Sequence, residues 1–246
     1  MREEKIIVDI LKQADNWDSL KKELEKFNTV ESNETKKSTQ AGKLFEFFAK
    51  YYFLTEPTQK INYKNVWLYN EVPPSILDKL KLPYKDYGID LILQDTHDKF
   101  AAVQCKFKND ETLELNWTKD KLGNAFGLAK NCDRLIIFTN ASSVTNVAKK
   151  LTSSYEQICY DSLSDISSET FNDLLEVANG NSPKPHQKKR PREHQVKAID
   201  AVINHLKEND RCQLILPCGA GKTLTALWIK EEIKAIKTLE IGRAHV

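Results

Sequence analysis

Two neighbouring runs of alternating residues constrain the fold more than any other part of the chain. Residues 87–93 and 100–107 are rich in branched and aromatic side chains, a composition typical of strands. The polar segment 94–99 between them is typical of a turn. The two strands are therefore predicted to form a hairpin.

The polar residues of this hairpin are predicted to gather on one of its faces, because side chains two positions apart on a strand point the same way. That face would carry Asp90, Gln104 and Lys106. The opposite, buried side is expected to hold Ile89, Leu91, Leu93, Val103, Cys105 and Phe107. A carboxylate, an amide oxygen and an ammonium placed together can hold a divalent cation and polarise a water or a phosphoryl oxygen. The alternative is a solvated face on which Asp90 pairs with a nearby lysine.

Apolar periodicity and turn residues predict the remaining elements. Helices are expected over 3–27 (in one or two pieces), 41–54, 118–129, 168–178, 193–206 and 223–236. Strands are expected over 66–69, 134–139, 157–160 and 213–217, and a loop over 28–39. This order predicts an α/β fold with a mixed central sheet flanked by helices.

The distribution of charge predicts a boundary near residue 180. The chain of 246 residues carries a net charge of only +2, yet residues 181–239 hold twelve Lys/Arg against six Asp/Glu. The expected organisation is a helical segment 1–35, a first domain 36–180, a basic linker 181–192, the incomplete start of a second domain 193–239, and a tail 240–246. The tail resembles translated sequencing-adapter sequence, so the natural protein is expected to continue beyond about Leu239; a natural terminus is the alternative.

A second motif, residues 216–223, is predicted to bind phosphate. It follows an expected strand and opens an expected helix, and it contains Gly219, Gly221, Lys222 and Thr223. The two glycines let backbone N–H groups approach a phosphate, Lys222 supplies a positive charge, and Thr223 offers a hydroxyl to Mg²⁺. The strict phosphate-loop pattern has glycine at position 216, where this chain has leucine.

With that departure, the motif resembles the first motif of superfamily-two (DEAD/DEAH-type) helicases, and the second domain is similar to the first strand-loop-helix of their RecA-like ATPase domain. Gln195 precedes the motif and matches the glutamine that contacts adenine in those helicases. The resemblance implies that Gln195, Gly219, Gly221, Lys222 and Thr223 bind ATP with Mg²⁺ in a complete motor. Without the later motor motifs, this chain alone is not expected to hydrolyse ATP efficiently.

The hairpin motif, Asp90 followed by Gln104 and Lys106, resembles the Mrr-like branch of the PD-(D/E)XK nucleases. In that branch a Gln-x-Lys replaces the more common Asp/Glu-x-Lys, and Glu46 matches a carboxylate on the family's first helix. The resemblance covers residues 39–178 and implies a restriction-endonuclease-like fold. It also implies catalysis by Asp90, Gln104, Lys106 and Glu46, with Mg²⁺ or Mn²⁺ held by Asp90, Gln104 and Glu46.

Together the two motifs predict a Mg²⁺-dependent DNA endonuclease coupled to an ATP-dependent translocase or helicase, as in restriction or phage-defence enzymes. DNA would be bound mainly through its backbone phosphates. Two alternatives stay open: a DNA-binding or docking module that does not cut, and an RNA substrate. Sequence or methylation specificity, cut pattern, translocation direction and oligomeric state do not follow from the sequence.

The remaining composition predicts a cytoplasmic protein with no membrane partner. The five cysteines are dispersed without paired spacing, as is typical of reduced thiols, and so predict neither a disulfide framework nor a zinc site. The N-terminus shows no signal peptide, and no apolar run approaches the ~20 residues of a membrane span.

Overall fold

The protein contains a five-stranded mixed sheet in the first of its two units. In the computed structural model, residues 2–27, 34–116, 122–145, 155–183, 190–215 and 221–235 are described. The chain divides into the units Met1–Pro185 and His186–Val246. The strands are β1 (Tyr63–Leu68), β2 (Leu91–Asp95), β3 (Phe100–Lys106), β4 (Arg134–Thr139) and β5 (Tyr155–Ile158), and they lie in the order of the sequence. This architecture confirms the predicted fold class.

The predicted hairpin is the antiparallel half of this sheet. Strands β1, β2 and β3 pair antiparallel, whereas β4 and β5 add in parallel beside β3. In the hairpin, Leu91 lies opposite Val103 and Leu93 opposite Ala101. Parallel addition of β4 aligns the ends of β3 and β4, so that Lys106 lies beside Thr139.

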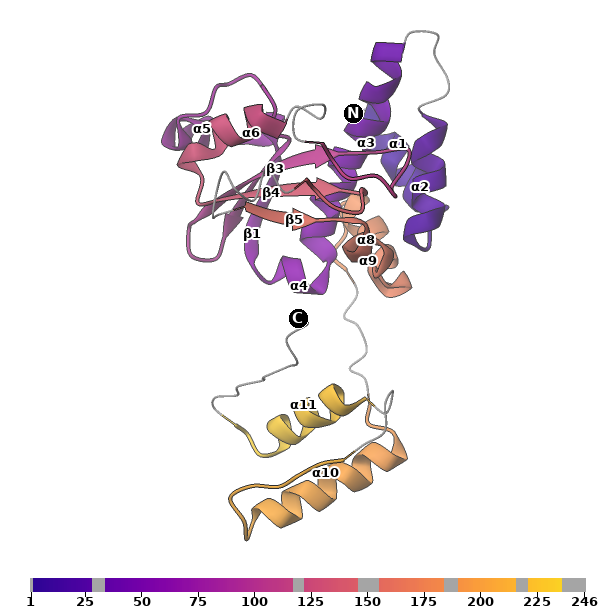
Figure 1. The fold of residues 1–246 in the computed structure, drawn as a ribbon, viewed down its shortest axis with the longest axis vertical. Helices are drawn as coiled ribbons and strands as arrows, with labels where there is room; N and C mark the ends of the chain where they lie inside the picture. Colours follow the sequence, from indigo (N-terminus) through magenta and orange to yellow (C-terminus); the bar gives the residue numbers. More distant parts are fainter. Residues whose placement is uncertain are drawn as a thin grey trace. The chain divides into compact units, whose positions relative to one another are not determined.

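Helices from both ends of the first unit cover one face of the sheet. They are α1 (Arg2–Leu11), α2 (Trp17–Lys26), α3 (Glu34–Thr55), α8 (Tyr160–Ser164) and α9 (Ser168–Ala178). Aromatic side chains of α3 pack on the middle of the sheet, with the ring centroids of Phe45 and Phe138 5.1 Å apart. Asn16 caps α2 by accepting a hydrogen bond from the backbone N–H of Ser19. Figure 1 shows α1, α2 and α3 together on this side.

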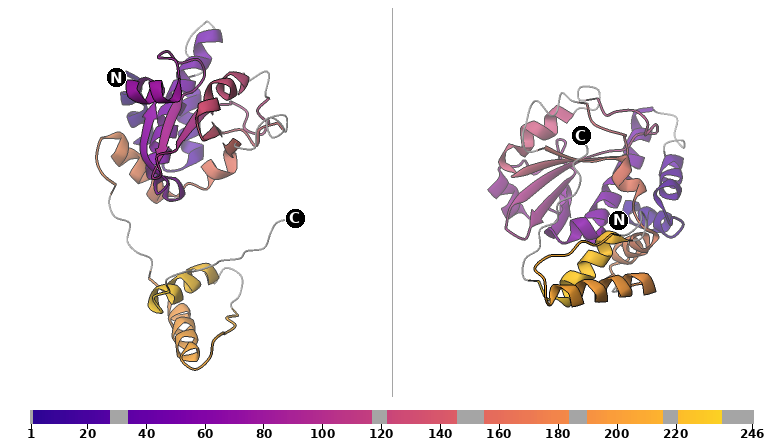
Figure 2. Two further views of the ribbon diagram at one scale, coloured as in Figure 1. Left: turned by 90° about the vertical axis from the view of Figure 1, so that its left-hand side faces the viewer. Right: turned by 60° about the horizontal axis from the view of Figure 1, so that its bottom comes forward.

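Shorter helices cover the other face. They are α5 (Pro74–Leu80), α6 (Leu122–Leu128) and the 3₁₀ turns η1 (Tyr69–Glu71) and η2 (Ala129–Asn131). Leu77 of α5 and Leu122 of α6 are buried with Ile92 and Ile137 of the sheet. Figure 2 shows the sheet between this layer and the α1–α3 layer. Both faces of β2 and β3 are therefore buried, and the strands read as nearly continuous apolar runs.

Several predicted elements differ from the observed ones. The segment 28–39 is predicted to be a loop, but it is helical from Glu34. Once buried residues have fixed the later turns of α3, each further residue joins the helix with one new hydrogen bond, so the helix extends easily into polar sequence. The first hairpin strand begins at Leu91, and the helix expected from residue 118 begins, within the described residues, at Leu122. Ile89 is buried as expected, but with the α5–α6 layer, because alternation holds only inside a regular strand.

The second unit consists of α10 (Glu193–Leu206) and α11 (Lys222–Glu232), which pack through Ile199, Val202 and Ile229. The strand predicted at 213–217 is wrong over its described part, since residues 213–215 are irregular and Ile215 is 81% exposed. A strand needs a neighbour for its ladder of hydrogen bonds, and the described residues of this unit contain no other strand. Residues 216–220 lie outside the described residues.

The two edge strands of the sheet are irregular or short. The pairing of β1 with β2 shifts in register between Tyr63 and Asn65, and the exposed Lys64 lies at this bulge, where it forms an ion pair with Asp98. At the other edge, β5 has four residues, and the side chains of Glu156 and Gln157 are exposed. Within the described residues, no helix is long and apolar enough to cross a membrane.

Candidate active site

Asp90 is held immediately before β2 by hydrogen bonds to its backbone N–H, its backbone carbonyl and its carboxylate. Its backbone N–H donates to the Val103 carbonyl at 2.8 Å, and its carbonyl accepts from the Tyr69 N–H at 2.8 Å. Its carboxylate Oδ2 accepts the Cys105 N–H at 2.6 Å and a hydrogen bond from Gln104 Nε2. The side chain is thus fixed, and among the described residues no hydrogen bond reaches its Oδ1.

The turn before Asp90 depends on Asp86 and Gly88. Asp86 Oδ1 accepts the N–H groups of Gly88 at 2.7 Å and of Ile89 at 3.2 Å. Gly88 has a φ of +122°, a conformation that L side chains rarely adopt. This pair of residues directs the chain into the strand with the Asp90 carboxylate facing the site.

Glu46 lies on α3, on a turn anchored by Phe45 and Phe48. Its carboxylate Oε2 is 2.8 Å from Lys43 Nζ, and its side chain is 16% exposed. Glu46 and Asp90 line one cavity of about 340 Å³. The other lining residues are Glu3, Lys43, Phe47, Leu68, Tyr69, Asn70, Tyr84 and Asp86. The structure therefore brings together the helix carboxylate and the strand carboxylate that the sequence predicted as partners.

The two carboxylates resist ionising at the same time. Burial raises the pKa of Glu46 to about 8, and the negative charge of Asp90 adds to this shift while Lys43 opposes it. Burial likewise raises the pKa of Asp90 to about 6, against the hydrogen bond from Cys105 and the positive charge of Lys106. Excess negative charge in a small buried volume is what a bound cation relieves.

Lys106, at the end of β3, is close enough for its charge to act on Asp90, but neither Lys106 nor Gln104 is among the residues that line the cavity of Glu46 and Asp90. The Lys106 backbone carbonyl accepts the Thr139 hydroxyl at 2.7 Å. Two residues further on, the Asn140 side chain clamps Lys108, accepting its N–H and donating to its carbonyl, both at 2.7 Å. Asn140 is fully buried, so the chain leaving Lys106 is fixed to the end of β4.

Gln104 lies in the site with its amide nitrogen, rather than its oxygen, towards Asp90. A cation ligand would need the oxygen, which the prediction assigned to it. Oxygen and nitrogen of an amide exchange places when the group turns over, so the hydrogen-bonding partner decides which atom faces Asp90. In the present arrangement Gln104 positions the Asp90 carboxylate.

The donor set of the cavity fits a hard divalent cation in part. Glu46 and Asp90 supply oxygen atoms in one buried volume, and hard cations such as Mg²⁺ keep several waters and bind through one or two carboxylates together with substrate phosphate. The described residues contain no group of three or more His, Cys, Asp and Glu side chains arranged to hold a metal. A cation there would therefore complete its coordination from water and substrate.

Two contributors to the site were not predicted from the sequence. Asp86 raises the pKa values of Glu46 and Asp90 through its charge, and Lys43 forms the ion pair with Glu46. Both had local signals that went unused. Asp86 lies two residues before a glycine at a strand entry, and Lys43 lies three residues before Glu46 on one helix face.

In the second unit, the structure places Gln195 against Gly221. Gln195 is 5% exposed and its Oε1 accepts the Arg192 N–H at 2.8 Å. A Cβ atom built on Gly221 would lie 2.6 Å from Gln195 Nε2. Lys222 and Thr223 begin α11 with exposed side chains, and Gly219 lies outside the described residues.

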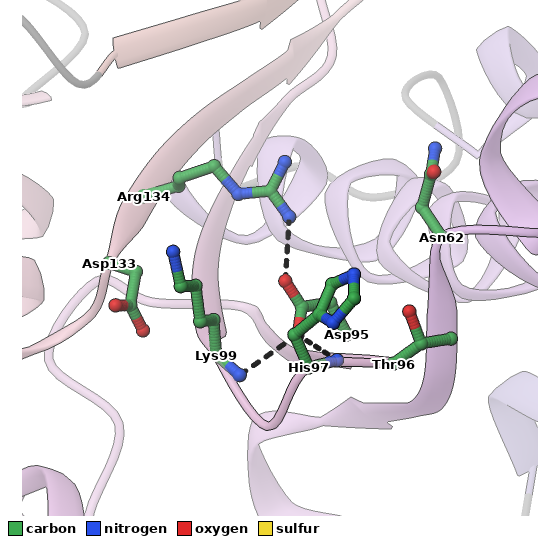
Figure 3. A pocket seen from close by; sticks show the side chains of 7 residues that line it. All are labelled: Asn62, Asp95, Thr96, His97, Lys99, Asp133 and Arg134. Atoms are coloured by element: carbon green, nitrogen blue, oxygen red, sulfur yellow. Dashed lines mark hydrogen bonds and ion pairs between the residues drawn. The ribbon is translucent and has the colours of Figure 1, made fainter.

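A second cavity, of about 500 Å³, lies at the other end of the hairpin (Figure 3). It is lined by Asn62, Asp95, Thr96, His97, Lys99, Asp133 and Arg134. Its carboxylates are already engaged, since Asp95 accepts the N–H groups of His97 and Lys99, and Asp133 accepts that of Phe100. It contains none of the predicted catalytic residues.

Comparison with known proteins supports an assignment for both units. Residues 54–176, half of the chain, match the family model described as restriction endonuclease, and these residues contain β1 to β5 with Asp90, Gln104 and Lys106. The chain belongs to the restriction endonuclease family. Residues 188–240 match the res subunit of Type III restriction enzymes, so a fragment of a helicase domain follows. Both results confirm the predicted resemblance.

One solved structure resembles most of the chain. The ATP-dependent Type ISP restriction-modification enzyme LlaBIII bound to DNA matches with a TM-score of 0.61 and 27% identity, over 83% of this chain and 13% of that one. The present chain thus spans a small part of that enzyme. A protein of unknown function, AF1548, matches with a TM-score of 0.30 and 16% identity, over 78% of this chain and 98% of its own. No curated protein matches the sequence.

Proposed function

We propose that the first unit is a Mg²⁺-dependent (or Mn²⁺-dependent) DNA endonuclease, coupled to an ATP-dependent translocase of which the second unit is the beginning. The observation that carries the proposal is the buried pair of Glu46 and Asp90 in one cavity, with Lys106 close enough to influence the ionisation of Asp90. The family of the first unit and the DNA-bound restriction-modification enzyme that resembles the chain support it.

The reaction is hydrolysis of a phosphodiester. A water oxygen attacks phosphorus, one P–O ester bond breaks, and the departing oxygen takes up a proton. Glu46 and Asp90 would hold the cation, which supplies positive charge beside the phosphate oxygens. Lys106 would orient the attacking water and offset the charge that builds on the phosphate.

Substitutions at the site test the nuclease proposal. Asp90→Ala and Lys106→Ala should each abolish Mg²⁺-dependent cleavage of DNA, whereas their thermal unfolding should remain cooperative. Lys99→Ala, an exposed lysine at the other end of the hairpin, is the matched control and should cleave normally. Cleavage that survives in either site variant would exclude this assignment.

The alternative of a DNA-binding module that does not cut would be favoured if Glu46 pointed away from Asp90. Glu46 lines the same cavity as Asp90, and the negative charge of Asp90 raises its pKa, so the arrangement supports the nuclease instead. An RNA substrate is tested in the same assay by offering a matched RNA, which we expect to stay intact.

The motor part of the proposal concerns a protein that contains the complete ATPase domain. There Gly219, Gly221, Lys222 and Thr223 would bind the phosphates and Mg²⁺, and Gln195 would contact adenine. Lys222→Ala in that protein should remove ATP-dependent translocation. Translocation that continues at the normal rate would contradict the proposed nucleotide site.

A further inference from the structure

Two tyrosines and a lysine are exposed in the segment that leads into the candidate active site. Tyr84 is 70% exposed and Tyr87 is 57% exposed, and Lys85 between them is also exposed. The Lys85 Nζ lies 6.0 Å from the centroid of the Tyr87 ring. We name Tyr84, Lys85 and Tyr87 the tyrosine strip. Large aromatic surface left in water is costly and often marks a binding site.

The tyrosine strip is held in place at both ends. The Tyr84 hydroxyl donates to Asp78 Oδ1 at 2.6 Å, and the carbonyl of the preceding Pro83 accepts the Tyr69 hydroxyl at 2.6 Å. After the strip, Asp86 closes the turn onto Gly88. The Tyr84 ring and the backbone on both sides of the strip are therefore held in a defined geometry, which reduces the entropy lost on binding.

The strip adjoins the candidate catalytic residues. Tyr84 lines the same cavity as Glu46 and Asp90, and Tyr87 is three residues from Asp90 in the chain. A molecule whose reacting group enters the cavity would thus contact the strip with its neighbouring groups.

The charges of this region explain why a polyanion would need the strip. The cavity is lined by Glu3, Glu46, Asp86 and Asp90 against a single lysine, Lys43, so its own field repels phosphate. Outside it, the exposed Lys85 lies between Tyr84 and Tyr87 in the chain. Lysine between aromatic rings is suited to a nucleic-acid strand, because ammonium groups bind phosphates while ring faces stack on bases of any sequence.

We infer that the tyrosine strip binds the DNA strand that is cleaved, with the Tyr84 and Tyr87 rings stacking on nucleotides next to the scissile phosphate and Lys85 contacting a backbone phosphate. The inference rests on the proposed nuclease function and extends it by assigning the residues that position the substrate. They are positioning residues, since the reacting atoms lie at Asp90 and Lys106.

The test measures DNA binding separately from cleavage. The 246-residue chain carrying Lys106→Ala is titrated into a short fluorescein-labelled single-stranded DNA with Mg²⁺, because unpaired bases expose the ring faces that a duplex covers, and binding is followed by anisotropy. Tyr84→Ala and Tyr87→Ala should each weaken binding by about 5- to 50-fold, the range for losing one stacked base. Tyr87→Phe keeps the ring and should stay within about 2-fold of the parent. Lys85→Ala should lower the slope of log K against log salt by about one.

The matched control is Ile61→Ala, because Ile61 is an apolar residue with the same 70% exposure as Tyr84 and lies just before β1 rather than beside the site. It should bind DNA like the parent. Unchanged binding in both tyrosine variants would overturn the inference. Equal weakening by Ile61→Ala would also overturn it, because the effect would then be unspecific.

Cleavage by the chain without the Lys106→Ala change separates this inference from the proposed function. If that chain cuts DNA and the tyrosine variants have the same KM as the parent, the inference about the strip fails while the nuclease proposal stands. If it binds DNA through the strip and does not cut, the nuclease proposal fails and the strip stands. A rise in KM with kcat nearly unchanged in Tyr87→Ala is the expected result.

Discussion

At the scale of single residues, Glu46 should make stability depend on pH. Its pKa is about 8 in the folded protein against an ordinary value of 4.5, so folding favours the protonated form. The stabilisation that comes from binding this proton is complete at pH values below 4.5. It is lost as the pH rises through about 8, where Glu46 of the folded protein also ionises. Glu46→Gln is neutral at every pH and should therefore raise Tm relative to the parent by about 2–4 °C at about pH 9, and by less at about pH 5.

That comparison is made by thermal unfolding in EDTA, so that no cation compensates the charge. An equal Tm difference at both pH values would contradict the raised pKa of Glu46. Glu114→Gln serves as the control, because it replaces an exposed glutamate and should leave Tm unchanged at both pH values.

Asn140 should act on catalysis through the backbone that follows Lys106. Asn140→Ala removes both hydrogen bonds to Lys108 and leaves two polar groups without their partner, at a cost of about 1–3 kcal/mol. With Lys106 less well fixed, kcat should fall while KM changes little, which steady-state cleavage assays would show. Asn179→Ala removes a hydrogen bond on an exposed helix end and should leave kcat unchanged.

At the scale of elements, two glycines should respond to alanine in opposite directions. Gly88→Ala forces a side chain into a φ of +122° and should destabilise the protein by about 1–2 kcal/mol while displacing Asp90. Gly42→Ala lies inside α3 with no atom within 4 Å of the new Cβ, and should stabilise by about 0.5–1 kcal/mol. Urea unfolding measures both, and a destabilised Gly42→Ala would show that the account of α3 is wrong.

The elements that the sequence predicted well are those in which apolar residues recur regularly or turn residues mark the end of the element. The β2–β3 hairpin, β4, α9 and α10 all follow from apolar pattern and turn residues. The start of α3 at Glu34 did not follow, because a polar helical turn has no apolar stripe to reveal it. The fully buried β2 also did not alternate as expected, since helices on both faces of a sheet remove the polar side.

The sequence predicted that Glu46 and Asp90 would lie together, as they do, but not the balance of charge around them. Asp90, Lys106 and Glu46 stand out by residue type and spacing. The structure adds that Lys43 pairs with Glu46, that Asp86 lines the same cavity, and that the Gln104 nitrogen faces Asp90; the first two had sequence signals that went unused, whereas the orientation of Gln104 had none.

At the scale of the whole molecule, the two units should respond separately to mutation. Gly221 has a φ of +76°, and a Cβ there would lie 2.6 Å from Gln195 Nε2, so Gly221→Ala should loosen the contact between α10 and α11. Hydrogen exchange should increase in residues 193–232 and stay constant in β1 to β5. Cleavage should stay constant too, because the candidate catalytic residues lie within the first unit. Faster exchange in the sheet would show that the units are coupled.

The irregular edge strand β1 and the short edge strand β5 affect whether the protein aggregates at high concentration. An exposed edge strand is a template on which another chain can add by backbone pairing, and that is how many sheet proteins begin to form fibrils. The bulge at Lys64 interrupts this template on one side, and the brevity of β5 with its outward Glu156 limits it on the other. Polymerisation through the sheet is thereby disfavoured, even though the inner strands are rich in the branched and aromatic residues that promote it.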